Sequence, residues 1–130
     1  MSDEKLREFA QRYAQAWCSQ NPESVATFFA ERGSLSINNG PPAVGRAAIA
    51  REAQAFMTTF PDMVVTFDKL EPTPNGVEFH WTLTGTNTGP RGTGKRVRIN
   101  GYELWKIDNG LIAESKGNFD SAEYERQLRG

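Results

Sequence analysis

GYELWKIDNGLIAESKGNFD, residues 101–120, contains the clearest turn signal in the chain. Two alternating runs flank Asp108-Asn109-Gly110, and Asn-Gly in this position favours a β-hairpin because both turn residues need a positive φ. A two-residue loop at Asn109-Gly110 places Asp108 opposite Leu111 and sets the register of both strands. The cross-strand pairs that follow are Ile107–Ile112, Trp105–Glu114, Glu103–Lys116 and Ile99–Asp120.

One face of this predicted hairpin is mainly apolar, because side chains alternate across a strand and paired residues share a face. Such a face is expected to be buried, and buried charges are rare without a partner or a purpose. Its polar members are therefore the first candidates for a functional site. A one-residue bulge at Asp108 would undo this assignment. The residues assigned to the face are Ile99, Glu103, Trp105, Ile107, Ile112, Glu114, Lys116, Asn118 and Asp120.

Composition narrows the class of protein. The chain has 130 residues, which predicts one domain over residues 1–130. Its 15 basic and 16 acidic residues give a formal net charge of -1, so no overall field favours nucleic acid or an anionic membrane. One cysteine, Cys18, allows no internal disulfide and no metal-ligand cluster. With no membrane-length apolar run and a charged N-terminus, a cytoplasmic location is expected.

Upstream of the hairpin, helical periodicity gives way to a period of two at Met63. Ser2 can cap a first helix, and Asn21 can cap a short second one. A third helix follows Gly45 and stops at Pro61, because proline disfavours helical geometry in the preceding residue.

Alternating runs predict strands over residues 33–38, 63–70 and 77–86, and residues 121–128 fit a short terminal helix. Helices followed by a sheet meander predict an α+β fold, with an antiparallel sheet covered on one face.

Asp120 has two interpretations. With Glu123 three residues later it forms a capping box for the terminal helix, which is the better supported interpretation from sequence. Alternatively, it is a carboxylate at the mouth of an apolar pocket, where desolvation raises its pKa and suits it to proton transfer. The two roles are compatible.

Four further residues also have a structural and a functional interpretation. As predicted cross-strand neighbours, Glu103 and Lys116 form either a structural ion pair or a polar grip on a ligand. Tyr13 and Trp17 lie on the apolar stripe of the first helix, where most aromatic residues belong to the core. A tyrosine hydroxyl there must still find a partner or a ligand. His80, the one histidine, is predicted to lie on the outer face of the sheet.

The order and spacing of several segments resemble the nuclear transport factor 2-like superfamily, and most closely the SnoaL-like polyketide cyclases. The resemblance covers nearly the whole chain. It implies a cone-shaped, curved antiparallel sheet wrapped on N-terminal helices around an internal hydrophobic pocket. The segments that carry it are Phe60-Pro61-Asp62-Met63, Trp81-Thr82-Leu83-Thr84-Gly85-Thr86, Thr93-Gly94-Lys95-Arg96-Val97, Gly110-Leu111-Ile112-Ala113-Glu114, and Asp120 with Gln127-Leu128.

The resemblance also implies roles for individual residues. Asp120 matches the aspartate that serves the cyclases as general acid/base without a cofactor. Compared with ketosteroid isomerases, Tyr13 matches the oxyanion-hole tyrosine and Glu103 matches the protonated carboxylic acid. Lys116 replaces a tryptophan that is usual in the cyclases. The isomerases' general-base aspartate corresponds to about Ile37 or Asn38, which argues against steroid isomerase chemistry.

Two hypotheses follow. In the first, the chain is a small cofactor-independent and metal-independent enzyme that acts on an apolar carbonyl- or ester-containing substrate as a cyclase, isomerase or hydrolase. Asp120 is its acid/base group, and Tyr13 or Glu103 supports the developing enolate oxygen. In the second, the chain is a non-catalytic ligand-binding or dimerisation module. The residues expected to line the pocket are Trp17, Phe56, Trp81 and Trp105, with Lys116 and Asn118 as polar contacts.

A homodimer is also expected. Three helices can cover only one face of the sheet, and the outer face is predicted to carry Tyr102, Leu104 and Phe119.

Overall fold

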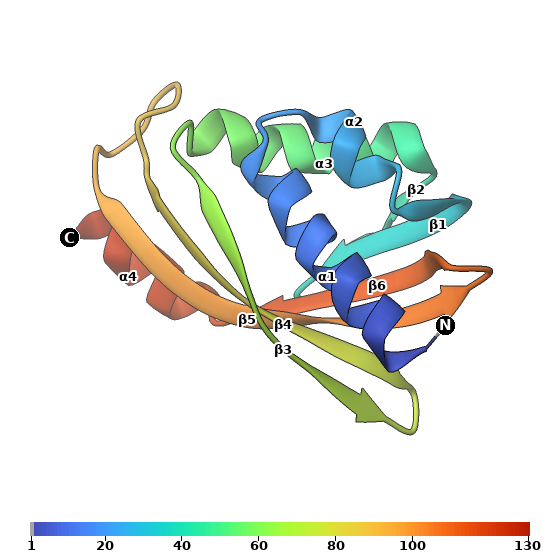
Figure 1. Cartoon of the computed structure of the whole chain (residues 1–130). Coiled ribbons are helices and arrows are strands. Elements are labelled where there is room, and N and C mark those ends of the chain that lie inside the picture. Colours follow the sequence, from blue (N-terminus) through green and yellow to red (C-terminus); the bar gives the residue numbers. More distant parts are fainter. Residues whose placement is uncertain (1) are drawn as a thin grey trace.

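A six-stranded curved sheet in the order β2-β1-β6-β5-β4-β3 forms the frame of the molecule. The computed structural model describes residues 2–130. The sheet is left open along its two edge strands, and Figure 1 shows its strands curving around the N-terminal helices. The strands are β1 (Phe29–Ile37), β2 (Ala43–Val44), β3 (Val64–Thr73), β4 (Gly76–Thr86), β5 (Arg96–Asp108) and β6 (Leu111–Phe119).

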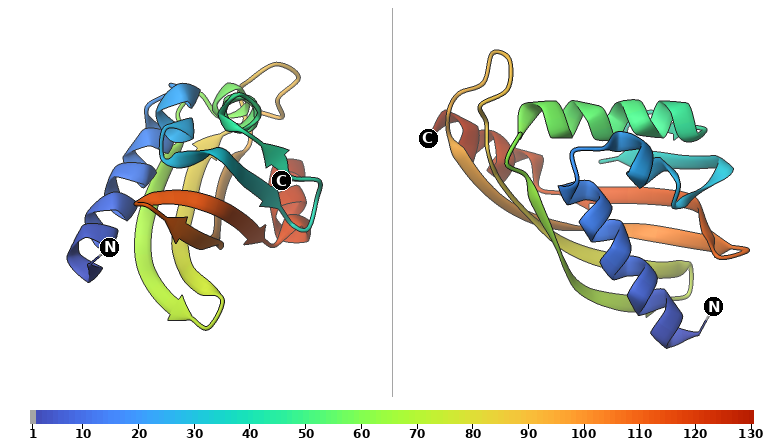
Figure 2. Two further views of the ribbon diagram at one scale, coloured as in Figure 1. Left: turned by 90° about the vertical axis from the view of Figure 1, so that its right-hand side faces the viewer. Right: turned by 45° about the horizontal axis from the view of Figure 1, so that its top comes forward.

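Three helices lie on the concave side of the sheet, as the two views in Figure 2 show. They are α1 (Asp3–Cys18), α2 (Pro22–Ala26) and α3 (Arg46–Thr59). The Ser2 hydroxyl accepts a hydrogen bond from the Lys5 amide, and the Asn21 side chain accepts one from the Glu23 amide. Both predicted caps are therefore confirmed, as is the placement of the helices before Phe60 apart from a short one at the end of the chain. No helix within residues 2–130 has the length and apolar character needed to cross a bilayer.

The sheet is mixed, which corrects the antiparallel prediction. β1 pairs antiparallel with the two-residue β2 on one side and parallel with β6 on the other. The prediction assumed pairing between neighbours in sequence. Parallel pairing instead needs a long crossover connection, and here the chain from α3 to β5 provides it.

The turn of the β5–β6 hairpin is the predicted one. Asn109 and Gly110 have φ values of 51° and 76°, and Asp108 and Ile107 pair with Leu111 and Ile112. The register then shifts between Ile107 and Lys106, because Lys106 pairs with Glu114 and Ala113 becomes an extra residue on β6. This is a β-bulge, and it lies at Ala113 rather than at Asp108.

The bulge makes three predicted pairs wrong: Trp105–Glu114, Glu103–Lys116 and Ile99–Asp120. Trp105 pairs with Ser115 and Glu103 pairs with Gly117. A one-residue slip moves every following side chain to the other face of a sheet. Accordingly, Ser115 is fully buried and Lys116 is exposed.

The last helix, α4 (Ser121–Arg129), lies against β5. The Gln127 side chain accepts a hydrogen bond from the Arg98 amide at 2.6 Å and donates one to the Arg98 carbonyl at 2.9 Å. The pairing of β5 with β6 begins only at Gly101, which is opposite Phe119. The amide group of Gln127 therefore takes the place of a strand beyond the end of β6.

Candidate functional site

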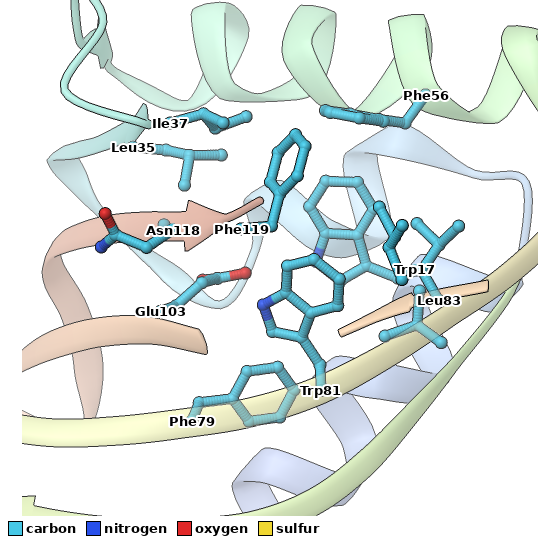
Figure 3. A pocket seen from close by; sticks show the side chains of 13 residues that line it. Trp17, Leu35, Ile37, Phe56, Phe79, Trp81, Leu83, Glu103, Asn118 and Phe119 are labelled. Carbon is cyan, nitrogen blue, oxygen red and sulfur yellow. The ribbon is translucent and has the colours of Figure 1, made fainter. Parts of the chain in front are cut away.

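An apolar pocket lies between α1, α3 and the inner face of the sheet. Its volume is about 60 Å³. A water-sized atom needs ~10–15 Å³ on this measure, so the pocket has room for roughly four to six non-hydrogen atoms. Figure 3 shows the lining side chains, which are Trp17, Leu35, Ile37, Phe56, Val65, Phe79, Trp81, Leu83, Ile99, Glu103, Gly117, Asn118 and Phe119.

Glu103 is the only titratable residue of the lining. β5 places it near the middle of the sheet, where it is only 7% exposed. Its Oε1 atom accepts three hydrogen bonds: from the Tyr13 hydroxyl at 2.9 Å, the Trp105 indole N–H at 3.0 Å and the Ser115 hydroxyl at 2.7 Å. α1, β5 and β6 each contribute one donor, so three elements fix one carboxyl oxygen.

The second oxygen of Glu103, Oε2, receives no hydrogen bond from residues 2–130. Within those residues, Trp17 Nε1 is the only side-chain nitrogen or oxygen atom that is both fully buried and unpartnered. Oε2 therefore keeps contact with open space, and the pocket is the open space beside it. In Figure 3 the carboxyl group is turned toward Phe119 and Trp81. The proton of a neutral Glu103 belongs on Oε2, because Oε1 already accepts three hydrogens.

The electrostatics of this carboxyl group combine opposing effects. Burial raises the pKa of Glu103 above its ordinary value, and the hydrogen bonds from Trp105, Ser115 and Tyr13 offset part of the rise. Burial, followed by the charge of Glu103, raises the pKa of Tyr13 well above its ordinary value. Tyr13 therefore stays neutral, and the protonated form of Glu103 persists to a higher pH than that of an ordinary glutamate.

Tyr13 and Ser115 do not line the pocket, but both donate hydrogen bonds to Glu103. Tyr13 is fully buried, with its ring 5.2 Å from that of Trp105, and its hydroxyl is directed at Glu103 rather than into the pocket. Ser115 was not predicted as a site residue, because the unbroken register placed it on the opposite face. Only recognition of the bulge at Ala113 brings Ser115 next to Glu103.

The predicted aromatic walls are mostly present. Trp17, Phe56 and Trp81 line the pocket. Trp105 lies behind the wall, where its ring stacks on Phe79 at 4.8 Å and an interplanar angle of 10°. The Trp17 indole N–H is buried and has no hydrogen-bond partner within residues 2–130.

Three predicted polar residues lie in different places. Asn118 lines the pocket. Lys116 is exposed, and its Nζ atom lies 3.6 Å from Glu114 Oε1. Asp120 is exposed outside the lining and caps α4, accepting a hydrogen bond from the Glu123 amide at 3.1 Å. The structure therefore brings Glu103, Tyr13 and Asn118 to the pocket region and leaves Lys116 and Asp120 away from it.

His80 lies on the outer surface, as predicted. Its Nε2 atom is 2.9 Å from Glu78 Oε1 and 3.4 Å from Glu71 Oε2. These acidic partners account for the position of the histidine, which does not belong to the lining of the pocket.

Gly117 provides space beside Glu103. A Cβ atom added at Gly117 would lie 3.8 Å from Glu103 Cγ, in ordinary contact, so the missing side chain leaves the pocket open at this point. Gly101 lies opposite Trp81 on the neighbouring strand, where a Cβ atom would lie 2.8 Å from the indole. An added Cβ would also meet the Asn118 carbonyl oxygen, so only glycine fits at residue 101.

The family of SnoaL-like polyketide cyclases matches residues 7–128. The chain belongs to this family. No curated protein sequence matches it significantly.

Solved structures of the ketosteroid isomerase-like fold are similar over nearly the full chain. A protein with this fold from Catenulispora acidiphila, in complex with trimethylamine, has a TM-score of 0.81 and 18% identity, covering 99% of this chain and 95% of its own. A phenazine biosynthesis-related protein from Pseudomonas aeruginosa has a TM-score of 0.81 and 19% identity, with coverages of 97% and 86%. TsrD from Streptomyces laurentii has a TM-score of 0.83 and 17% identity, with coverages of 98% and 97%. These similarities establish the fold.

Proposed function

We propose that this member of the SnoaL-like family is a small cofactor-independent enzyme in which Glu103 is the acid/base group. The substrate class is a small apolar molecule that carries a carbonyl or ester group. The proposal rests on one observation: a buried carboxyl group whose Oε1 is held by three donors and whose Oε2 is free to meet a ligand. Asp120 keeps only its capping role in this proposal.

The size and polarity of the pocket support this substrate class. A volume of about 60 Å³ is small for a polycyclic substrate and supports a small one. Glu103 and Asn118 are the only lining residues with polar side-chain atoms besides the two tryptophans. The trimethylamine bound by the Catenulispora acidiphila protein supports a small ligand for this fold.

The mechanism uses Glu103 first as a base and then as an acid. In its ionised form, Oε2 takes a proton from the carbon next to the carbonyl group, which leaves an enolate and a neutral Glu103. In a substrate with a β,γ double bond the enolate is conjugated and accepts the same proton at the γ carbon, which is an isomerisation. In a substrate with a second carbonyl group the enolate carbon attacks that carbonyl carbon, which closes a ring and leaves an alkoxide oxygen to be protonated by Glu103. A carboxyl pKa that burial raises above the ordinary value suits proton transfer in both steps. The three donors on Oε1 hold the carboxylate in one orientation throughout.

Exchange of carbon-bound hydrogen tests the proposal before the natural substrate is known. A panel of small ketones and esters in deuterated water, followed by NMR, should show exchange next to the carbonyl group in the presence of the protein. Glu103→Gln keeps the volume and the acceptor for the three donors but cannot transfer a proton, so exchange should fall by at least ~100-fold.

Asp120→Asn is the matched control, because it removes a carboxylate outside the pocket, and its exchange rate should match that of the wild type. Retained exchange in Glu103→Gln would rule out Glu103 as the acid/base group, and loss of exchange in Asp120→Asn would contradict the purely structural role of Asp120. Binding of panel members without any exchange would favour the ligand-binding module.

A further inference from the structure

Five aromatic side chains surround the space in front of Glu103: Trp17, Phe56, Phe79, Trp81 and Phe119. Figure 3 shows Trp81 and Phe119 beside the carboxyl end of Glu103, with Trp17 and Phe56 farther along the pocket. No lysine, arginine or histidine belongs to the lining. Aromatic rings attract cations through the negative potential of their faces, and this attraction strengthens when the cation is desolvated. The wall therefore favours a positive ligand and disfavours an anion.

The arrangement around Oε1 is also suited to a negative charge on Glu103. A neutral carboxylic acid has no need of three donors on one oxygen, whereas a buried carboxylate does, because hydrogen bonds to an ionised acceptor are the stronger ones. The donors from Tyr13, Trp105 and Ser115 all converge on Oε1. A cation on the side of Oε2 would balance the charge of the carboxylate.

We propose that this pocket binds small hydrophobic ammonium ions, with the aromatic rings around the alkyl groups and the Glu103 carboxylate as the counter-charge. The inference uses the same pocket as the proposed function but does not depend on catalysis. A free-base amine would take the Oε2 proton itself and become the ammonium ion. A permanently charged ammonium would instead displace that proton into solvent.

The proton released on binding of a permanently charged ammonium ion must come from Glu103, because no neighbouring group can supply it. α1 contributes Tyr13, whose raised pKa keeps it neutral. β4 contributes Phe79, and β6 contributes Ser115 and Gly117. Within residues 2–130, no other titratable or charged side chain contacts the carboxyl group from these elements.

Isothermal titration of the full chain with tetramethylammonium chloride tests the inference, because the charge of this ion does not change with pH. Titrations at about pH 4.5, the ordinary pKa of glutamate, in two buffers of different ionisation enthalpy report the protons released, because a raised pKa keeps at least half of Glu103 protonated at this pH. We expect proton release on binding and an affinity that rises with pH as Glu103 ionises. tert-Butanol, a neutral molecule of similar shape, should bind without proton release and without this rise.

Glu103→Gln sharpens the test. The glutamine amide presents an N–H donor to the pocket, as the neutral acid does, but it cannot ionise. It should weaken tetramethylammonium binding by at least ~10-fold while tert-butanol binding is retained. Asp120→Asn should leave both affinities unchanged.

Equal affinities for the two probes, or tetramethylammonium binding without proton release, would overturn the inference. The proton count uses only the wild-type chain, so the test remains decisive if the variant does not fold. If the chain shows Glu103-dependent exchange but does not bind ammonium ions, the proposed enzyme stands and the ammonium site is wrong. If it binds ammonium ions but shows no exchange, the ammonium site stands and the proposed enzyme is wrong.

Discussion

Glu103 is neutral or ionised depending on a balance between burial and three hydrogen bonds. The two oxygens of its side chain have different roles, since Oε1 is held by the protein and Oε2 is left for a ligand. Such a group links ligand binding, proton transfer and folding stability, because each of them changes with the same protonation equilibrium.

Stability should reveal this equilibrium directly. The pKa of Glu103 is higher in the folded chain than in the unfolded chain, so its protonation favours folding at low pH. This contribution is fully present below the unfolded-state pKa of about 4.5 and is lost as pH rises through the folded-state pKa. We expect the unfolding free energy of the wild type, measured with urea, to fall relative to that of Glu103→Gln as pH rises above about 4.5. Parallel stability curves for the two proteins would contradict the raised pKa.

Among the structural elements, the bulged strand β6 decides which side chains reach the pocket. Because of the bulge, Ser115 points inward beside Glu103 and Lys116 points outward. Ser115→Asp would therefore bury a second carboxylate, and an uncompensated buried charge costs about 3–5 kcal/mol, so we expect a loss of this size in the free energy of unfolding, measured by chemical denaturation. Lys116→Asp, one residue further along the strand, is the control and should cost far less because its side chain is exposed. Equal losses of stability in the two variants would contradict the bulged register.

This element also shows how far the sequence could predict the fold and the site. Asn109-Gly110 predicted the turn, because few residues accept positive φ twice in succession, and the caps at Ser2 and Asn21 followed from equally local chemistry. The bulge has no comparable local signature, because an alanine fits a regular strand as well as a bulged one. The prediction therefore placed Lys116 at the pocket and omitted Ser115. The parallel pairing of β1 could not be predicted either, because it joins segments far apart in the chain.

The terminal helix gives a second prediction at the level of elements. Gln127→Ala removes both hydrogen bonds to the Arg98 backbone. The strand end is exposed, so water can replace part of the loss, and we expect a decrease of about 1 kcal/mol in unfolding free energy. Gln11→Ala on the exposed side of α1 should have little effect, since α1 keeps its buried face. Equal stabilities of the two variants would mean that α4 does not depend on this contact.

For the whole molecule, a homodimer through the outer face of the sheet remains our prediction. Phe119, which was assigned to that face, lines the pocket instead, while Tyr102 and Leu104 stay half-buried on the outside. We expect light scattering at micromolar concentration to give twice the mass of one chain. Tyr102→Glu should shift the mass toward that of one chain, because it places like charges against each other in a symmetric interface. A monomeric wild type at high micromolar concentration would contradict the dimer.

The parallel pairing of β1 with β6 constrains how the chain is made as well as how it is arranged. β1 ends at Ile37, whereas the strand beside it starts only at Leu111. During synthesis, the edge of β1 that pairs with β6 therefore stays unpaired until residues 111–117 have left the ribosome. Contacts between distant segments form slowly, because the closure of a long loop precedes any gain from them. The last strand to emerge thus completes the sheet and, through Ser115, the hydrogen bonds of Glu103, so a nascent chain acquires its site only at the end of folding.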